Sequence, residues 1–167
     1  MSREMRSEEF LCESMQKFGK AVYSLALSQV HRKQDAEDIC QDVFLRLLED
    51  HTEFRSDEHL KAWLLRVTVN RCHDLFRSAF NRRREPLDEQ TGVEECEDPL
   101  ESDVWACIES LPPKLRAVVH LYYGEGYSCK EIAQIVGCTC AAAHTRLHQA
   151  RAKLKLELSN EIRGQCS

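Results

Sequence analysis

One segment divides this chain. Residues 85–103 carry nine acidic and no basic side chains, and they include two prolines and a glycine with almost no apolar periodicity. Such a composition is typical of a solvated linker, because the segment has too few apolar groups to bury. We therefore expect two small helical domains, residues 1–84 and 104–167, joined by an acidic flexible linker over 85–103.

Apolar residues on both sides of the linker recur three and four positions apart, which is the spacing of one face of an α-helix. With only six glycines and four prolines in 167 residues, the chain is predicted to be all-α. The first predicted helix has its apolar stripe at Leu11, Met15, Phe18, Val22 and Leu25.

Two more helices are expected before the linker. The second begins after Asp35, whose side chain would cap it. Its predicted buried face consists of Ile39, Cys40, Val43, Phe44, Leu47 and Leu48. The third begins near Ser56 or Asp57, and its predicted buried face consists of Leu60, Trp63, Leu64, Val67 and Leu75.

The composition excludes several classes of protein. No apolar run approaches the roughly 20 residues of a membrane span, so we expect no membrane insertion and a cytoplasmic location. The nine cysteines are an odd number without a Cys-x-x-Cys pair, which favours reduced thiols over a disulfide scaffold. No phosphate-binding loop, nucleophilic triad or pair of carboxylates stands out, so we expect neither an enzyme nor a cofactor.

A helix-turn-helix is predicted near the C-terminus. Ser128 and Glu131 have the spacing of a capping box, Gly137 supplies a turn, and a long helix is expected from about Thr139 to Leu158. The stretch 144–155 contains four Lys or Arg and no acid, so it should attract DNA in a salt-dependent manner. The alternative is a basic amphipathic helix with a solvated face.

A second basic surface is expected at the end of the third helix. Residues 66–84 hold six arginines against the single acid Asp74. Four polar residues there recur at spacings of 4, 3 and 4, which places them on one stripe of the helix. They are Arg66, Asn70, His73 and Arg77.

The C-terminal motifs resemble the promoter-binding fourth region of extracytoplasmic-function (ECF) sigma factors. That family has a Leu-Pro start, a bulky helix, Gly-x-Ser/Thr-x-x-Glu-Ile-Ala and then Ser/Thr-Arg-Leu-x-x-Ala-Arg. These features match Leu111-Pro112, Tyr122, residues 126–133 and residues 145–151. This half alone also resembles other bacterial activators.

The N-terminal half decides between these families. Residues 35–50, DAEDICQDVFLRLLED, resemble the polymerase-binding helix of the second sigma region, and residues 54–77 resemble its promoter-melting helix. The resemblance implies an alternative sigma factor that binds core RNA polymerase, directs it to promoter DNA and assists promoter opening. An anti-sigma factor is a further partner that it implies.

The resemblance also implies roles for single residues. Asp38, Gln41 and Asp42 would face core polymerase, where acidic and amide groups complement an arginine-rich surface. Phe54 and Asn70 would hold an unstacked base of the minus-ten element, and Arg66, His73 and Arg77 would follow phosphates. For Phe54 an ordinary core contact fits equally well, and Trp63 is expected in the core.

Contacts to the minus-thirty-five element are expected from the second helix of the helix-turn-helix. They are Ala142, His144, Thr145, Arg146, His148, Gln149 and Arg151. The run Ala141-Ala142-Ala143-His144 departs from the Gly-Thr-Val-Lys-like run that is commoner in the family. Few side chains in this run can therefore recognise bases. This raises the share of Thr145, Arg146, Gln149 and DNA shape in recognition.

Other interpretations stay open at this stage. A helix-turn-helix regulator acting without being a sigma subunit is the main alternative, and an adaptor that binds acidic protein surfaces is the third. The linker is either a plain tether or a segment that enters the RNA path of the polymerase. Cys138, Cys140, His144 and His148 have spacings that zinc could use, but such a site would occupy the recognition surface, so we expect no metal. Thiol sensing through Cys138 and Cys140 is not favoured either.

Overall fold

The computed structural model of this chain describes residues 6–82 and 106–165, and the side chains through 79 and from 106 to 155. All regular structure in these ranges is helical, which confirms the predicted fold class. The chain divides into two compact units, Met1–Gly92 and Val93–Ser167. The predicted acidic linker lies outside the described residues.

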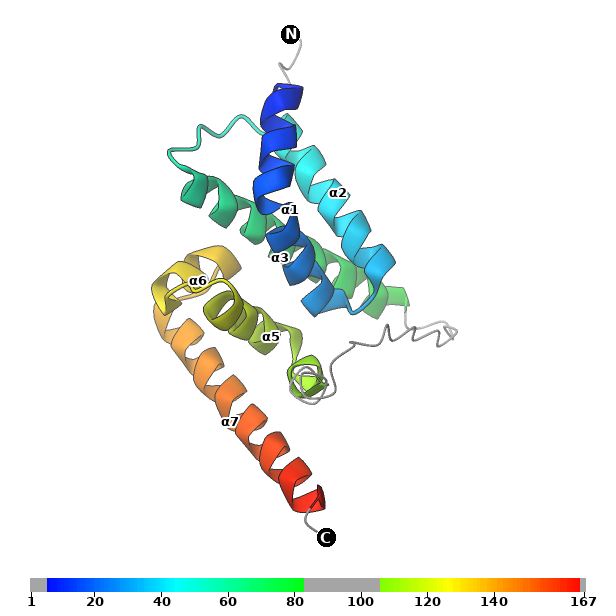
Figure 1. Ribbon diagram of the computed structural model, residues 1–167, viewed down its shortest axis with the longest axis vertical. Coiled ribbons are helices and arrows are strands. Elements are labelled where there is room, and N and C mark those ends of the chain that lie inside the picture. The colour runs from blue at the N-terminus through cyan, green and yellow to red at the C-terminus, as the bar shows by residue number, and fades with distance from the viewer. Residues whose placement is uncertain (1–5, 83–105, 166–167) are drawn as a thin grey trace. The chain divides into compact units, whose positions relative to one another are not determined.

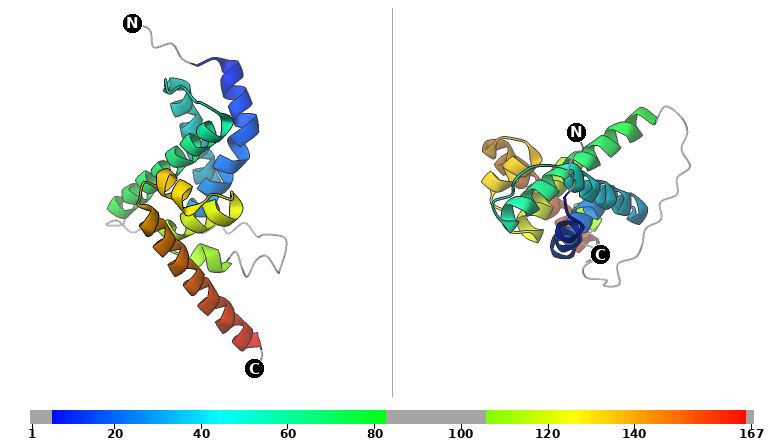
Figure 2. Two further views of the ribbon diagram at one scale, coloured as in Figure 1. Left: turned by 90° about the vertical axis from the view of Figure 1, so that its left-hand side faces the viewer. Right: turned by 90° about the horizontal axis from the view of Figure 1, so that it is seen from above.

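The first unit consists of three helices, α1 (Glu8–Val30), α2 (Lys33–Glu49) and α3 (Asp57–Arg82). Each helix contacts the other two, as Figures 1 and 2 show. Side chains with no exposed surface form the centre of the core, and they come from all three helices: Val22, Ala26, Ala36, Val43, Leu47, Leu64 and Cys72.

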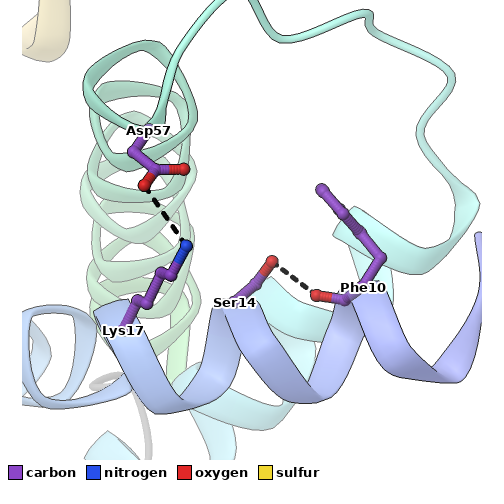
Figure 3. Close-up of polar contacts among 4 residues, drawn as sticks. All are labelled: Phe10, Ser14, Lys17 and Asp57. Atoms are coloured by element: carbon purple, nitrogen blue, oxygen red, sulfur yellow. Dashed lines mark hydrogen bonds and ion pairs between the residues drawn. The ribbon is translucent and has the colours of Figure 1, made fainter.

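The predicted stripe of α1 is wrong at one position. Met15 is 49% exposed, whereas its neighbour Ser14 is buried. The Ser14 hydroxyl donates a hydrogen bond to the Phe10 carbonyl, one turn earlier on the same helix, at 2.7 Å (Figure 3). This small polar side chain can therefore be buried with its hydrogen bond made. On the same helix Lys17 reaches Asp57 at the start of α3 at 3.3 Å. Phe18, Val22 and Leu25 are buried as predicted.

Two further expectations for this unit are wrong. Helix α2 begins at Lys33 rather than after Asp35, and its N-cap Arg32 makes no side-chain cap bond. Asp35 lies in the first turn instead, where its carboxylate interacts favourably with the positive end of the helix dipole. Leu75 is 36% exposed, because Leu64, Leu65, Thr68, Val69 and Cys72 already fill the core-facing side of α3.

The second unit contains a short helical stretch at 106–110, then α5 (Pro113–Val119), the π-helical turn η1 (His120–Gly124), α6 (Cys129–Val136) and α7 (Cys140–Gln165). Helix α7 packs against both α5 and α6. One core cluster joins Leu111, Leu115 and Val119 to Ala150. Arg116 is buried here, and its Nη1 donates to the Glu109 carbonyl at 2.9 Å.

The predicted helix-turn-helix is confirmed in its local chemistry. Ser128 and Glu131 make both bonds of the capping box, the backbone N–H of Ser128 donating to Glu131 at 2.9 Å. Gly137 ends α6 with a φ of 76°, a conformation that favours glycine. Helix α7 begins at Cys140, where Thr139 accepts the Ala142 N–H at 3.1 Å.

Candidate nucleic-acid and protein interfaces

The polar face of α2 carries the three residues predicted to meet core polymerase. Asp38 and Gln41 are exposed, and Asp42 is half-buried. Leu45, which continues this stripe at the next turn, is 57% exposed. Protein contact surfaces combine an apolar centre with a polar rim, and Leu45 with its acidic and amide neighbours fits that pattern. The apolar periodicity could have found Leu45, because it lies outside the buried stripe of α2.

Asp42 is not a free carboxylate. Arg71 of α3 forms an ion pair with it, and the Arg71 guanidinium also lies 3.6 Å from Asp74. The sequence counted Arg71 with the basic surface of residues 66–84, but the fold turns it toward α2. Asp38, Asp42, Arg71 and Asp74, with the exposed Leu75, line an open hollow of about 400 Å³ between the two helices.

The loop between α2 and α3, residues 50–56, carries Phe54. Its ring is half-buried and packs against the core of the first unit. It meets His59 edge to face at 5.3 Å and Trp63 at 5.7 Å, both between ring centroids. Phe54, to which the resemblance assigns base capture, therefore also takes part in core packing.

A second open hollow, of about 500 Å³, lies beside this loop. Trp63 and Val67 line it on α3, Arg46 and Glu49 line it from the end of α2, and Asp50 and His51 from the start of the loop. The sequence assigned Trp63 and Val67 to the core, and both are only partly buried. An aromatic side chain in an open hollow with charged and polar walls is suited to a planar base. Phe54 and Asn70 are not among its lining residues.

The polar stripe of α3 is mostly open to solvent. Arg66, Asn70 and Arg77 are exposed, and His73 is partly buried. Spacings of four and three on one straight helix place them along a line, which suits a run of phosphates on one strand.

Most of the predicted base-reading residues of α7 are open to solvent. His144, Thr145, His148, Gln149 and Arg151 are exposed, whereas Ala142 and Arg146 are partly buried. The opposite face of the helix, with Ala143, Leu147 and Ala150, is buried as predicted. The Thr145 hydroxyl donates to the Ala141 carbonyl at 2.9 Å, so it is directed along its own helix.

Arg151 is held by two tyrosines that the sequence did not connect with it. Its Nε donates to the Tyr123 hydroxyl at 2.7 Å, and its guanidinium carbon lies 5.3 Å from the ring centroid of Tyr122 and 5.6 Å from that of Tyr123. The hydrogen bond with Tyr123 is the main cause that raises the pKa of Arg151. The two tyrosines therefore hold a cation that stays charged on the surface of this unit.

The cysteines of the described ranges are free thiols. Burial, helped by the charge of Glu37, raises the pKa of Cys40 to about 11, so this thiol stays protonated and unreactive. Within the described residues no group of three or more His, Cys, Asp or Glu side chains is placed to hold a metal ion. Cys138, Cys140, His144 and His148 are all in that range.

Two family models match this chain, one in each of its two units. Residues 15–83 match the model of sigma-70 region 2, and residues 102–154 match that of sigma-70, region 4. The chain belongs to the sigma-70 family. The region 2 match covers most of the first unit, so it favours a sigma factor over a helix-turn-helix regulator acting alone.

Relatives place the chain in the ECF group of sigma-70 factors. It is 31% identical to the ECF RNA polymerase sigma factor SigE of Mycolicibacterium smegmatis, over 86% of this chain and 59% of SigE. It therefore spans less than two thirds of the length of that relative. It is 24% identical to the RNA polymerase sigma factor SigV of Bacillus subtilis, over 96% of this chain and 98% of SigV.

Two solved structures share the fold. The sigma factor RpoE of Bartonella quintana, in complex with the anti-sigma factor NepR, superposes with a TM-score of 0.72 at 22% identity, covering 92% of this chain and 98% of RpoE. CnrH, in complex with the cytosolic domain of CnrY, gives a TM-score of 0.67 at 24% identity, with coverages of 92% and 90%. In the described part of this sigma-70 chain, no helix is both long and apolar enough for a membrane span.

Proposed function

We propose that this ECF-group chain acts as an alternative sigma factor that binds core RNA polymerase, directs it to promoters and assists their opening. The observation that carries the proposal is the presence of regions 2 and 4 in family order, each on its own folded unit. The chain itself performs no covalent chemistry, which the polymerase supplies. Its place of action is the cytoplasm.

Core polymerase binds the face of α2 that carries Asp38, Gln41 and Asp42. Acidic and amide groups there complement arginines on the partner, and Leu45 adds an apolar contact at the end of the stripe. Arg71 fixes the Asp42 carboxylate, which lowers the entropy lost when a partner arginine binds it.

The minus-ten strand lies along α3 and the loop at residues 50–56. Arg66, His73 and Arg77 follow its phosphates, while Phe54 and Asn70 help to hold an extruded base. The hollow lined by Trp63 and Val67, beside the same loop, supplies a further aromatic wall on which a base can stack. Unstacking a base costs a few kcal/mol, and a hollow that accepts only the extruded base returns part of this energy selectively.

The minus-thirty-five element is read by α7. His144, His148 and Gln149 project from its exposed face, and Thr145 and Arg146 lie one turn further on from Ala142. Arg151 binds a phosphate at the edge of this surface, because its tyrosine partners hold the cation in place.

We predict that Arg151→Gln removes one phosphate contact. The logarithm of the promoter affinity should then fall less steeply with the logarithm of salt concentration, by about 0.9 in slope. The measurement is a salt titration of promoter binding by the chain–polymerase complex. Lys114→Gln is the matched control, since it removes an exposed cation of α5 from the same unit. Equal slopes for wild type and Arg151→Gln would exclude the phosphate contact.

An anti-sigma factor completes the proposed set of partners. The structurally similar RpoE was captured with the anti-sigma factor NepR, and CnrH with the cytosolic domain of CnrY. A partner of that kind would compete with polymerase for the faces of α2 and α3 described above.

Transcription tests the proposal directly. The purified chain is mixed with bacterial core RNA polymerase, and the complex is isolated by size exclusion and given genomic DNA fragments. Co-elution together with transcripts that start at defined sites supports a sigma factor. If the chain shifts duplex DNA alone and never co-elutes with polymerase, it is a regulator and the first unit needs another function.

A further inference from the structure

Arg6 lies just before α1 and makes an unusual number of contacts with the end of α2. Its backbone N–H donates to the Leu48 carbonyl at 3.2 Å. Its Nε donates to the carbonyls of Leu47 at 3.1 Å and Asp50 at 2.8 Å, and its Nη2 donates to the carbonyl of Thr52. One residue thus satisfies carbonyls of the last turn of α2 and of the loop that follows.

The same guanidinium lies between two aromatic rings. Its central carbon is 5.0 Å from the ring centroid of Phe10 on α1 and 5.0 Å from that of Phe54 in the loop. Phe54 meets His59 and Trp63 with ring edges and faces, as described above. Arg6 is therefore the polar link that joins the Phe54 loop to α1 and α2 at once.

The other hydrogen bonds found for the loop at residues 50–56 join residues close in sequence. At its start the Thr52 N–H donates to Asp50 at 2.7 Å, and at its end the Arg55 N–H donates to His59 at 3.1 Å. Both hydrogen bonds join residues two to four positions apart, and neither connects the loop to α1. The hydrogen bonds of the Arg6 guanidinium, by contrast, join residues more than 40 positions apart in sequence.

We propose that Arg6 is a positioning residue for promoter opening. It fixes the loop at residues 50–56, and with it Phe54, in the conformation that accepts the extruded minus-ten base. The inference rests on the proposed function, in which this loop meets the opened strand. Arg6 itself need not touch DNA, because its donors are directed at backbone carbonyls.

The chemistry of the side chain supports this role. A planar guanidinium donates several bonds in a fixed fork and stacks on aromatic faces, whereas an ammonium does neither. The carbonyls at the C-terminal end of α2 also form the negative end of its dipole, which favours a cation there. Lysine would keep the charge and lose the fork.

The first measurement is hydrogen exchange in the free, full-length chain, which needs no polymerase. In Arg6→Ala the amides of residues 51–56 should exchange about tenfold faster than in wild type, and in Arg6→Lys by an intermediate factor. Lys20→Ala removes an exposed cation of α1 and should leave these amides unchanged. Thermal unfolding followed by circular dichroism is measured first, and exchange is then compared at a temperature at which every variant is folded.

The second measurement is promoter opening by the chain–polymerase complex, followed with a fluorescent adenine analogue in the minus-ten element. Arg6→Ala should open the promoter about tenfold more slowly, with polymerase binding unchanged. In a Phe54→Ala background the Arg6 substitution should have no further effect, because the loop then has no ring to position. A purely structural role would instead give additive losses.

Several outcomes would overturn the inference. These are unchanged exchange in the loop, faster exchange with an unchanged opening rate, and an additive effect with Phe54→Ala. Loss of polymerase binding in Arg6→Ala would also overturn it, since the damage would then be general. If the wild-type complex opens no promoter, the proposed function fails. The exchange data on the free chain then still show whether Arg6 holds the loop, so the two failures are distinguishable.

Discussion

Replacing both Asp38 and Asp42 by arginine is expected to abolish co-elution with core RNA polymerase. The two carboxylates lie one turn apart on the same side of α2, so both would meet the same partner surface. Truncating a charge in a desolvated interfacial pair costs about 2–5 kcal/mol, and reversal adds repulsion, so the affinity should fall by about a thousandfold or more.

A matched control is available on α1. Glu9 and Glu13 are also exposed and also four residues apart, so Glu9→Arg with Glu13→Arg produces the same change in net charge. This control should co-elute like wild type. Because Asp42→Arg places a cation beside Arg71, thermal unfolding of each variant is measured first. Equal loss of binding in both double variants would show that net charge, rather than the face of α2, governs the association.

Leu64→Ala is expected to give the largest loss of stability. This side chain of α3 has no exposed surface and lies in the core that joins the three helices of the first unit. Removing it leaves a cavity, which in comparable cores costs about 3 kcal/mol of unfolding free energy. For a unit of this size that corresponds to a fall of roughly 15 °C in melting temperature.

Leu45→Ala tests the same chemical change on the surface. Leu45 is 57% exposed, so the unfolding free energy should stay within about 0.5 kcal/mol of wild type. Urea unfolding followed by circular dichroism compares the two variants. If Leu45→Ala destabilised the chain as much as Leu64→Ala, the α2 face would be part of a core and not a free contact surface.

The sequence predicted the helices because their apolar faces repeat every three or four residues. That signal is local, and it identified the buried faces at Phe18, Val43 and Leu64. It failed at Met15, since periodicity gives only the direction of a face. Which residue at its edge is buried depends on the neighbouring helix, and here the smaller Ser14 fits. The prediction that Asp35 caps α2 is wrong. A carboxylate in the first turn interacts with the helix dipole as favourably as one at the cap, so the residue type alone did not distinguish the two positions.

The candidate interfaces were predictable to a smaller degree. Family motifs indicated the faces of α2, α3 and α7, whose predicted residues are mostly exposed. The contacts that shape those faces join residues far apart in sequence, as Arg71 does with Asp42, Tyr123 with Arg151, and Arg6 with Phe54. Spacing along one helix carries no information about such pairs, because they form only after the helices pack.

The π-helical turn η1 bears on how related chains can differ in length. Its Glu125 N–H donates to the His120 carbonyl five residues back, at 3.2 Å, so the turn holds one residue more than an α-helical turn would. Deleting a single residue between Val119 and Tyr123 would let α5 continue as a regular helix. Each residue of an α-helix turns the chain by about 100°, so the tyrosine that follows would be carried away from Arg151. Loss of one codon at this turn would therefore separate the tyrosine from Arg151 and remove the hydrogen bond that now holds the arginine.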